Sequence, residues 1–169
     1  MFDPETLALA GTVLTACRTR GWRLATAESC TGGLVAAALT ALAGSSEVVE
    51  RGFVAYSNAA KTTLLGVPEA MLAAHGAVSG ETATAMAEGA VARAGVDLAV
   101  SVTGVAGPGG GSAGKPVGLV HLGIARRRGP SGPVTAQSER HVFPGDRTAI
   151  RHAALIRALE LLSAEAQSG

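Results

Sequence analysis

The chain has 169 residues, of which 47% are hydrophobic and 16% charged, and its formal net charge is +1. A chain of this length buries a sizeable core without disulfides or metal, so we expect a single domain over residues 1–169. The near-neutral charge argues against a nucleic-acid partner, and every apolar stretch is broken well short of the ~20 residues that a membrane span needs.

The first residues read as the start of a helix, with Asp3 as its cap and Pro4 in its first turn. They lack the basic and then apolar layout of a signal peptide. The only cysteines are Cys17 and Cys30, so a structural disulfide is not expected. We therefore expect a cytoplasmic protein.

Helical and strand-like segments alternate in the first half of the chain. Apolar residues recur at helical spacing up to Cys17, and Gly21 ends that helix. Ser79 is a helix cap further along. After the first helix we expect a strand at residues 24–27, a helix at 34–42, a strand at 51–56 and two short helices at 58–65 and 69–74. The helix that Ser79 caps is expected at residues 80–94.

The second half of the chain contains a buried strand, a hairpin and a closing helix. Because helices separate the first three strands, those strands should be parallel, whereas the hairpin is antiparallel. The predicted fold is α/β, a three-layer α/β/α domain with a mixed, partly parallel sheet that ends in an antiparallel hairpin. These last elements are expected at residues 97–103, 117–125, 134–143 and 146–162, with Arg126 to Arg128 at a solvated hairpin tip.

The first strand runs directly into the turn Glu28-Ser29-Cys30-Thr31-Gly32-Gly33, after which a helix begins. The first N–H groups of a helix lack intrahelical partners, so such a turn is an anion site. Ser29 is therefore a candidate nucleophile that faces the unpaired backbone N–H groups at the start of this helix. Its neighbour Cys30 is either a small buried filler or a thiol activated by the helix N-terminus.

A second strand-to-helix turn carries Tyr56, Ser57 and Lys61. Lys61 is either a surface charge or a base, and a base needs a pKa far below its usual value. The helix start disfavours an ammonium by only ~0.3–1 kcal/mol, so burial must do the rest. Tyr56 either fills the core or relays a proton.

The glycine-rich stretch at residues 104–116 matches the residue spacing of two nucleotide-binding motifs, the dinucleotide-binding fingerprint and most of the phosphate-binding loop, but not their structural context. Both patterns require a helix next, but here Pro116 begins a strand. The first part of this loop, which includes Thr103, Gly104 and Gly107, follows a central strand. It lies at the end of the sheet where α/β proteins bind ligands, so it is a candidate binding loop. The alternative is a turn with a purely structural role. The histidines have no ligand-like spacing, so no metal and no cofactor is expected.

At these residues the chain resembles the CinA C-terminal domain family, whose stand-alone members are nicotinamide mononucleotide deamidases. The resemblance covers nearly the whole chain. It rests on Ala27-Glu28-Ser29-Cys30-Thr31-Gly32-Gly33, Ala43-Gly44-Ser45-Ser46, Arg51-Gly52-Phe53-Val54-Ala55-Tyr56-Ser57-Asn58 with Lys61, His75-Gly76-Ala77-Val78-Ser79, Thr103-Gly104-Val105-Ala106-Gly107-Pro108, Lys115-Pro116-Val117-Gly118 and Phe143-Pro144-Gly145-Asp146-Arg147.

The resemblance implies hydrolysis of the carboxamide of nicotinamide mononucleotide, without a metal, to nicotinate mononucleotide and ammonia. The family's catalytic serine, tyrosine and lysine match Ser29, Tyr56 and Lys61. Neutral Lys61 would deprotonate Ser29 directly or through Tyr56, and the amides of residues 31–33 would bind the oxyanion. The expected substrate-binding residues are Cys30, Thr31, Gly32, Gly33, Ser45, Ser46, Thr103, Gly104, Gly107 and Arg147, with Arg147, Ser45 and Ser46 as candidates for the phosphate.

Other functions remain open at this point. The chain could be a non-catalytic binder of a nucleotide, associated with competence or DNA damage as the family's name suggests. It could also hydrolyse another small amide, or use Cys30 as nucleophile. A small-molecule nucleotide is the expected partner, with no nucleic acid and no membrane, and we expect a homodimer or a higher homo-oligomer.

Overall fold

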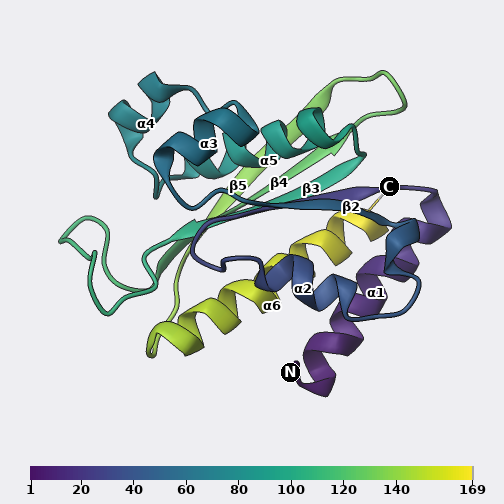
Figure 1. Cartoon of the computed structure of the whole chain (residues 1–169), viewed down its shortest axis with the longest axis horizontal. Coiled ribbons are helices and arrows are strands. Elements are labelled where there is room, and N and C mark those ends of the chain that lie inside the picture. Colours follow the sequence, from purple (N-terminus) through teal and green to yellow (C-terminus); the bar gives the residue numbers. More distant parts are fainter. Residues whose placement is uncertain (169) are drawn as a thin grey trace.

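The computed structural model describes residues 1–168, which form a five-stranded sheet with helices on both faces (Figure 1). The strand order is β2-β1-β3-β4-β5. In chain order, the elements are α1 (Pro4–Arg20), β1 (Leu24–Glu28), α2 (Leu34–Thr40), the short helix η1 (Ser45–Glu47), β2 (Val49–Val54), α3 (Asn58–Leu65), α4 (Glu69–His75), α5 (Gly80–Ala94), β3 (Leu98–Gly104), β4 (Leu119–Arg127), β5 (Val134–Val142) and α6 (Arg147–Gln167).

The sheet is mixed, as the sequence predicts. β1 pairs in parallel with both β2 and β3, whereas β3–β4 and β4–β5 are antiparallel. The boundaries differ by a few residues, and two differences matter. β2 ends at Val54, so Tyr56 lies beyond the strand. β4 continues to Arg127, so the predicted solvated hairpin tip is wrong for Arg126, whose guanidinium lies 4.5 Å from the centre of the Trp22 ring.

Each face of the sheet packs on its own layer of helices. Helices α1, α2 and α6 cover one face, and α3, α4 and α5 cover the other (Figure 1). All residues of β1 are buried, because a central parallel strand has helices on both sides. Helix α5 lies so close to β4 that a Cβ atom on Gly123 would be 2.3 Å from the carbonyl oxygen of Ala83.

The parallel strands bring three loops to one edge of the sheet. Since β1, β2 and β3 run in the same direction, the segments that follow Glu28, Val54 and Gly104 meet at their carboxyl ends. The glycine-rich loop and the start of α6 lie on the same side, at the left of Figure 1. No helix in residues 1–168 has the length and apolar content to cross a membrane.

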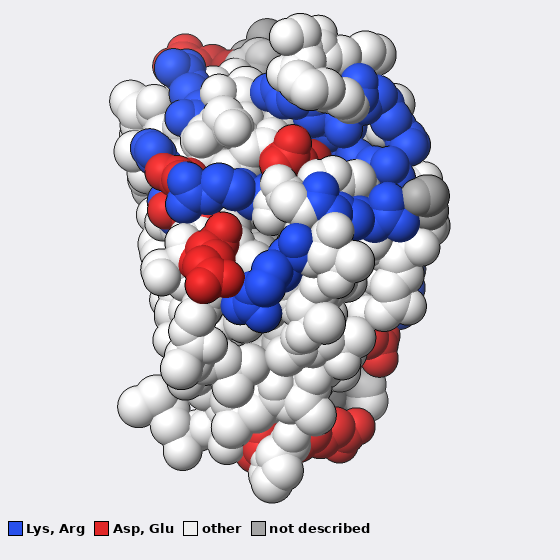
Figure 2. Space-filling view, turned by 90° about the vertical axis from the view of Figure 1, so that its right-hand side faces the viewer, with Lys and Arg blue, Asp and Glu red and all other residues white. Residues whose placement is uncertain are grey.

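The opposite end of the sheet carries many of the arginines. Figure 2 shows this end, where basic side chains surround acidic ones. The ion pairs formed here include Arg18–Glu47 and Arg126–Glu165, with N–O distances of 2.7 and 3.3 Å. The basic and acidic side chains at this end thus neutralise one another in part.

Candidate active site

Ser29 follows β1 directly and begins a tight turn into α2. Its backbone N–H donates to the carbonyl of Val102 on β3, at 2.9 Å, so the turn is anchored to the neighbouring strand. Gly32 and Gly33 have φ angles of +61° and +100°, which residues with a Cβ rarely adopt. Ser29 is 9% exposed, and its side chain reaches the cavity described below.

Lys61 is the buried partner of Ser29. Ser57 caps α3 by accepting a hydrogen bond from the Ala60 amide, which places Lys61 in the first turns of the helix. The side chain is 1% exposed, and its Nζ lies 3.1 Å from Ser29 Oγ. Two carbonyl oxygens, of Ala55 and Tyr56, lie 3.0 and 3.2 Å from the same nitrogen.

This set of contacts suits a lysine that gains and loses a proton. A neutral amine has two hydrogens and one lone pair, so the two carbonyls accept its hydrogens while the Ser29 hydroxyl donates to the lone pair. After proton transfer, the third N–H donates to the serine oxygen. Burial lowers the pKa of Lys61 below its usual value of 10.5, with a smaller opposing effect from Cys30, so the fold favours the neutral amine.

The amides expected to bind an oxyanion are partly occupied. The buried carboxylate of Glu28 accepts hydrogen bonds from the amides of Gly33, Val35 and Ala36, at 3.0, 3.1 and 2.9 Å. The Gly32 amide donates to the carbonyl of Ser29, at 3.0 Å. The prediction of free donors is therefore wrong for both glycines: the Glu28 carboxylate accepts the Gly33 amide, and the Ser29 carbonyl accepts the Gly32 amide.

Within residues 1–168, the backbone amides of Cys30 and Thr31 have no backbone or side-chain acceptor outside their own residues, and of the two residues only Cys30 lines the cavity described below. The carbonyls of these residues accept hydrogen bonds from Arg151 of α6, at 3.0 and 2.9 Å. Arg151 therefore braces the turn from behind. Sequence reasoning missed both Arg151 and the capping role of Glu28, since neither arginine spacing nor one acid before a serine identifies such a contact.

A cavity of about 300 Å³ opens in front of Ser29 and Lys61. At its mouth, Arg147 donates from Nη1 to the Gly107 carbonyl, at 2.8 Å, and from Nη2 to the Tyr56 hydroxyl, at 3.1 Å. Tyr56 is 59% exposed, so it does not fill the core. The cavity is lined by Ser29, Cys30, Tyr56, Lys61, Ala77, Val78, Thr103, Gly104, Val105, Ala106, Gly107, Gly109, Gly110 and Arg147.

The structure thus brings most of the predicted site residues together. Thr31, Gly32 and Gly33 form the turn that carries Ser29 rather than the lining. Ser45 and Ser46 lie elsewhere, in η1 before the start of β2, so the prediction that they face the substrate's phosphate is wrong for this cavity. The reason is topological: α2 connects two parallel strands, so it must run back to the opposite edge of the sheet.

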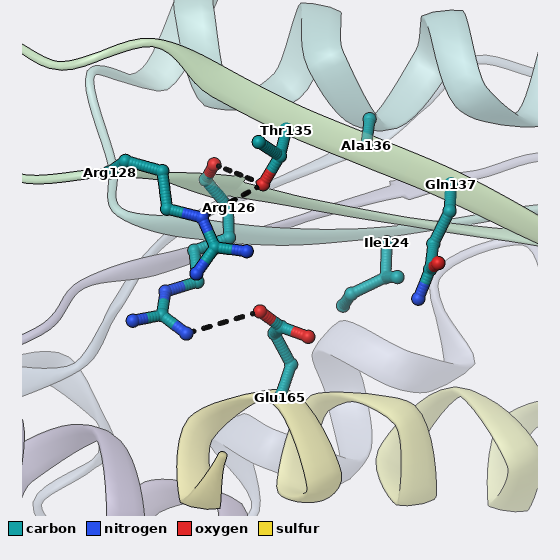
Figure 3. A pocket seen from close by; sticks show the side chains of 7 residues that line it. All are labelled: Ile124, Arg126, Arg128, Thr135, Ala136, Gln137 and Glu165. Atoms are coloured by element: carbon teal, nitrogen blue, oxygen red, sulfur yellow. Dashed lines mark hydrogen bonds and ion pairs between the residues drawn. The ribbon is translucent and has the colours of Figure 1, made fainter. Parts of the chain in front are cut away.

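Other groups in the described part of the chain offer less chemistry. A smaller cavity of about 130 Å³ between β4, β5 and α6 is lined by arginines and a glutamate without a nucleophile and base in contact (Figure 3). Within residues 1–168, no three His, Cys, Asp or Glu side chains are grouped so as to hold a metal ion. Burial raises the pKa of the Cys30 thiol to about 11, so this cysteine is mainly protonated at neutral pH.

Comparison with known proteins identifies the family of the chain. The CinA C-terminal domain model matches residues 6–166. The nicotinamide-nucleotide amidohydrolase PncC of Escherichia coli K12 is 48% identical over 162 residues, which cover 96% of this chain and 95% of that protein. The crystal structure of the competence/damage inducible protein CihA from Agrobacterium tumefaciens has a TM-score of 0.91 and 49% identity, and 99% of each chain is covered.

Longer relatives share the same region. A CinA-like protein of Anaeromyxobacter dehalogenans is 53% identical over 143 residues, which are 85% of this chain but 34% of that protein. The chain spans about a third of the length of several curated relatives that it matches.

Proposed function

The chain belongs to the family of CinA C-terminal domains, and we propose that it hydrolyses the carboxamide of nicotinamide mononucleotide to nicotinate mononucleotide and ammonia. The name of the Escherichia coli relative, which aligns over nearly the whole of both chains, supports this substrate. The observation that carries the chemistry is the contact of 3.1 Å between Lys61 Nζ and Ser29 Oγ inside a cavity.

In the first step, neutral Lys61 accepts the Ser29 proton while Oγ attacks the carboxamide carbon. The carbonyl oxygen gains a negative charge, which the backbone amide of Cys30, the turn residue beside Ser29 that lines the cavity, stabilises by hydrogen bonding. A well-aligned donor of this kind contributes about 3 kcal/mol. This amide follows the nucleophile directly in the same turn, so one local structure supplies both the nucleophile and the oxyanion donor.

In the second step, the Lys61 ammonium returns its proton to the amide nitrogen, and the C–N bond breaks to release ammonia. The nicotinate group remains as an ester on Ser29. Water then attacks this ester after giving a proton to Lys61, which hands it back to Ser29 Oγ as the acid product leaves. One lysine therefore serves as base and acid in both halves of the reaction.

Arg147 binds the phosphate of the substrate at the mouth of the cavity. Arg147 is exposed at the start of α6 and is one of the residues that line the cavity. A guanidinium forms paired, charge-assisted hydrogen bonds with phosphate oxygens. The substrate then spans the cavity from the carboxamide at Ser29 to the phosphate at Arg147.

Release of ammonia from nicotinamide mononucleotide by the purified protein tests this proposal. We expect turnover by the native chain and losses of at least about 1,000-fold in Ser29→Ala and Lys61→Met, because removing a member of a nucleophile and base pair costs this much or more. Ser46→Ala and Lys115→Met are the matched controls and should retain activity. Near-native turnover by folded Ser29→Ala or Lys61→Met would remove that residue from the mechanism.

Two relatives are named competence/damage-inducible proteins rather than enzymes, so the alternative proposal is a non-catalytic nucleotide binder. It predicts binding of the nucleotide without ammonia in any variant. The buried, hydrogen-bonded lysine beside a serine favours the enzyme, because a binding site does not require a base with a lowered pKa.

A further inference from the structure

Tyr56 contributes to the cavity through two separate groups. Its backbone carbonyl accepts a hydrogen bond from Lys61 Nζ, at 3.2 Å, and so belongs to the Ser29–Lys61 pair. Its hydroxyl instead accepts a hydrogen bond from Arg147 Nη2, at 3.1 Å. The main chain and the side chain of one residue thus have different partners, and the side chain is the exposed one.

The lysine leaves no position for the phenol. A tetrahedral amine nitrogen bonded to its own side-chain carbon has three other directions, whether these hold hydrogens or a lone pair. Ser29 Oγ and the carbonyls of Ala55 and Tyr56 occupy all three. A hydrogen bond from the Tyr56 hydroxyl to Lys61 would therefore displace a contact that already exists, and Ser29 needs no relay to reach the base.

Arg147, in contrast, is held by the phenol. Its guanidinium links three loops that are distant in sequence, because Tyr56 follows β2, Gly107 follows β3 and Arg147 itself begins α6. The guanidinium has five N–H donors, and these two contacts use two of them. The other N–H groups of Arg147 can donate to an anion, while one hydrogen bond from Nη1 and one from Nη2 hold the guanidinium in place.

We infer that Tyr56 is a positioning residue for substrate specificity: its hydroxyl holds Arg147 in place to bind the phosphate of the substrate, and Ser29 and Lys61 exchange their proton directly. This inference rests on the proposed function, since it assumes a phosphorylated substrate. It assigns Tyr56 to the choice of substrate rather than to the transfer of protons.

A pair of substrates separates these roles. Nicotinamide mononucleotide and nicotinamide riboside carry the same carboxamide, but only the first has a phosphate. Tyr56→Phe keeps the ring and removes the hydroxyl, and it should lower kcat/KM for the mononucleotide about 10-fold, mainly through KM, while the riboside changes less than about twofold. Adding Tyr56→Phe to Arg147→Met should cause no further loss, because the arginine that it positions is gone.

A relay predicts the opposite results. If Tyr56→Phe lowers kcat equally for both substrates, shifts the pH profile of kcat, or adds its full effect to that of Arg147→Met, the inference is overturned. Circular dichroism of each variant shows whether it is folded.

If the native chain releases ammonia from neither substrate, the proposed function fails but the positioning role is still testable. Calorimetric binding of the mononucleotide should then weaken in Tyr56→Phe and in Arg147→Met, without additivity in the double variant. Binding that Tyr56→Phe leaves unchanged would overturn the inference in that case.

Discussion

The buried carboxylate of Glu28 is expected to be a major source of stability for the turn that carries Ser29. It accepts three backbone amides at the start of α2, and Thr26 Oγ1 lies 3.1 Å from its Oε1. Glu28→Gln preserves the shape of the side chain but replaces one acceptor oxygen with an NH₂ group that has only hydrogens to offer.

The size of the effect follows from these contacts. In the better orientation of the glutamine, its oxygen still accepts the amides of Gly33 and Val35, and its NH₂ group faces the Ala36 amide. The unpaired Ala36 amide costs ~1–3 kcal/mol, and loss of the negative charge at the helix start costs a further ~0.3–1 kcal/mol. We therefore expect the free energy of unfolding to fall by about 1–4 kcal/mol, and Tm by about 3–16 °C for a chain of this size.

Thermal and urea unfolding followed by circular dichroism measure this loss. The control is Glu88→Gln on the exposed side of α5, which should change the free energy of unfolding by less than about 0.5 kcal/mol. If Glu28→Gln is as stable as this control, the carboxylate does not hold the turn, and the amides of α2 have other acceptors in solution.

Three further predictions concern other parts of the chain. Because only neutral Lys61 accepts the serine proton, kcat should rise with pH through the lowered pKa of Lys61. The unfolded chain keeps the Lys61 proton to higher pH than the folded chain does, so the free energy of unfolding should rise with pH below 10.5 by up to about 1.4 kcal/mol per pH unit relative to Lys61→Met. Urea unfolding at a series of pH values measures this slope. Cys30→Ala should retain most ammonia release, and a complete loss of activity in this folded variant would support the cysteine as nucleophile. Gly123→Ala should lower Tm by more than about 4 °C, because its Cβ would be 2.3 Å from the Ala83 carbonyl oxygen. The control Gly109→Ala has no atom within 4 Å of its Cβ and should change Tm little. Equal Tm values for the two variants would contradict the close packing of α5 on β4.

The sheet and most of the helices were predictable because their signals are local. The caps at Asp3, Ser57 and Ser79 each accept the expected backbone hydrogen bond, and helices between the first three strands require parallel pairing. The proximity of Ser29 and Lys61 was also accessible, since both follow neighbouring parallel strands at the same edge of the sheet.

The errors concern contacts that depend on tertiary structure. Whether Glu28 turns back onto α2 depends on the packing of the helix against β1, and no local pattern records it. Ser45 and Ser46 occur in a motif near the nucleophile in sequence, but the length of α2 carries them to the far edge of the sheet. The partner of the Tyr56 hydroxyl is an arginine 91 positions away, which sequence spacing does not indicate.

The protonation state of Lys61 is the most direct test of the mechanism. Lysine labelled with ¹³C at Cε gives few resonances in this chain, whose only lysines are Lys61 and Lys115, and the signal missing from Lys61→Met identifies the residue. We predict that this resonance titrates well below 10.5 and that the neutral amine is present in the pH range of activity. Titration at the usual value for lysine would mean that the amine next to Ser29 is charged, and it could not serve as the base.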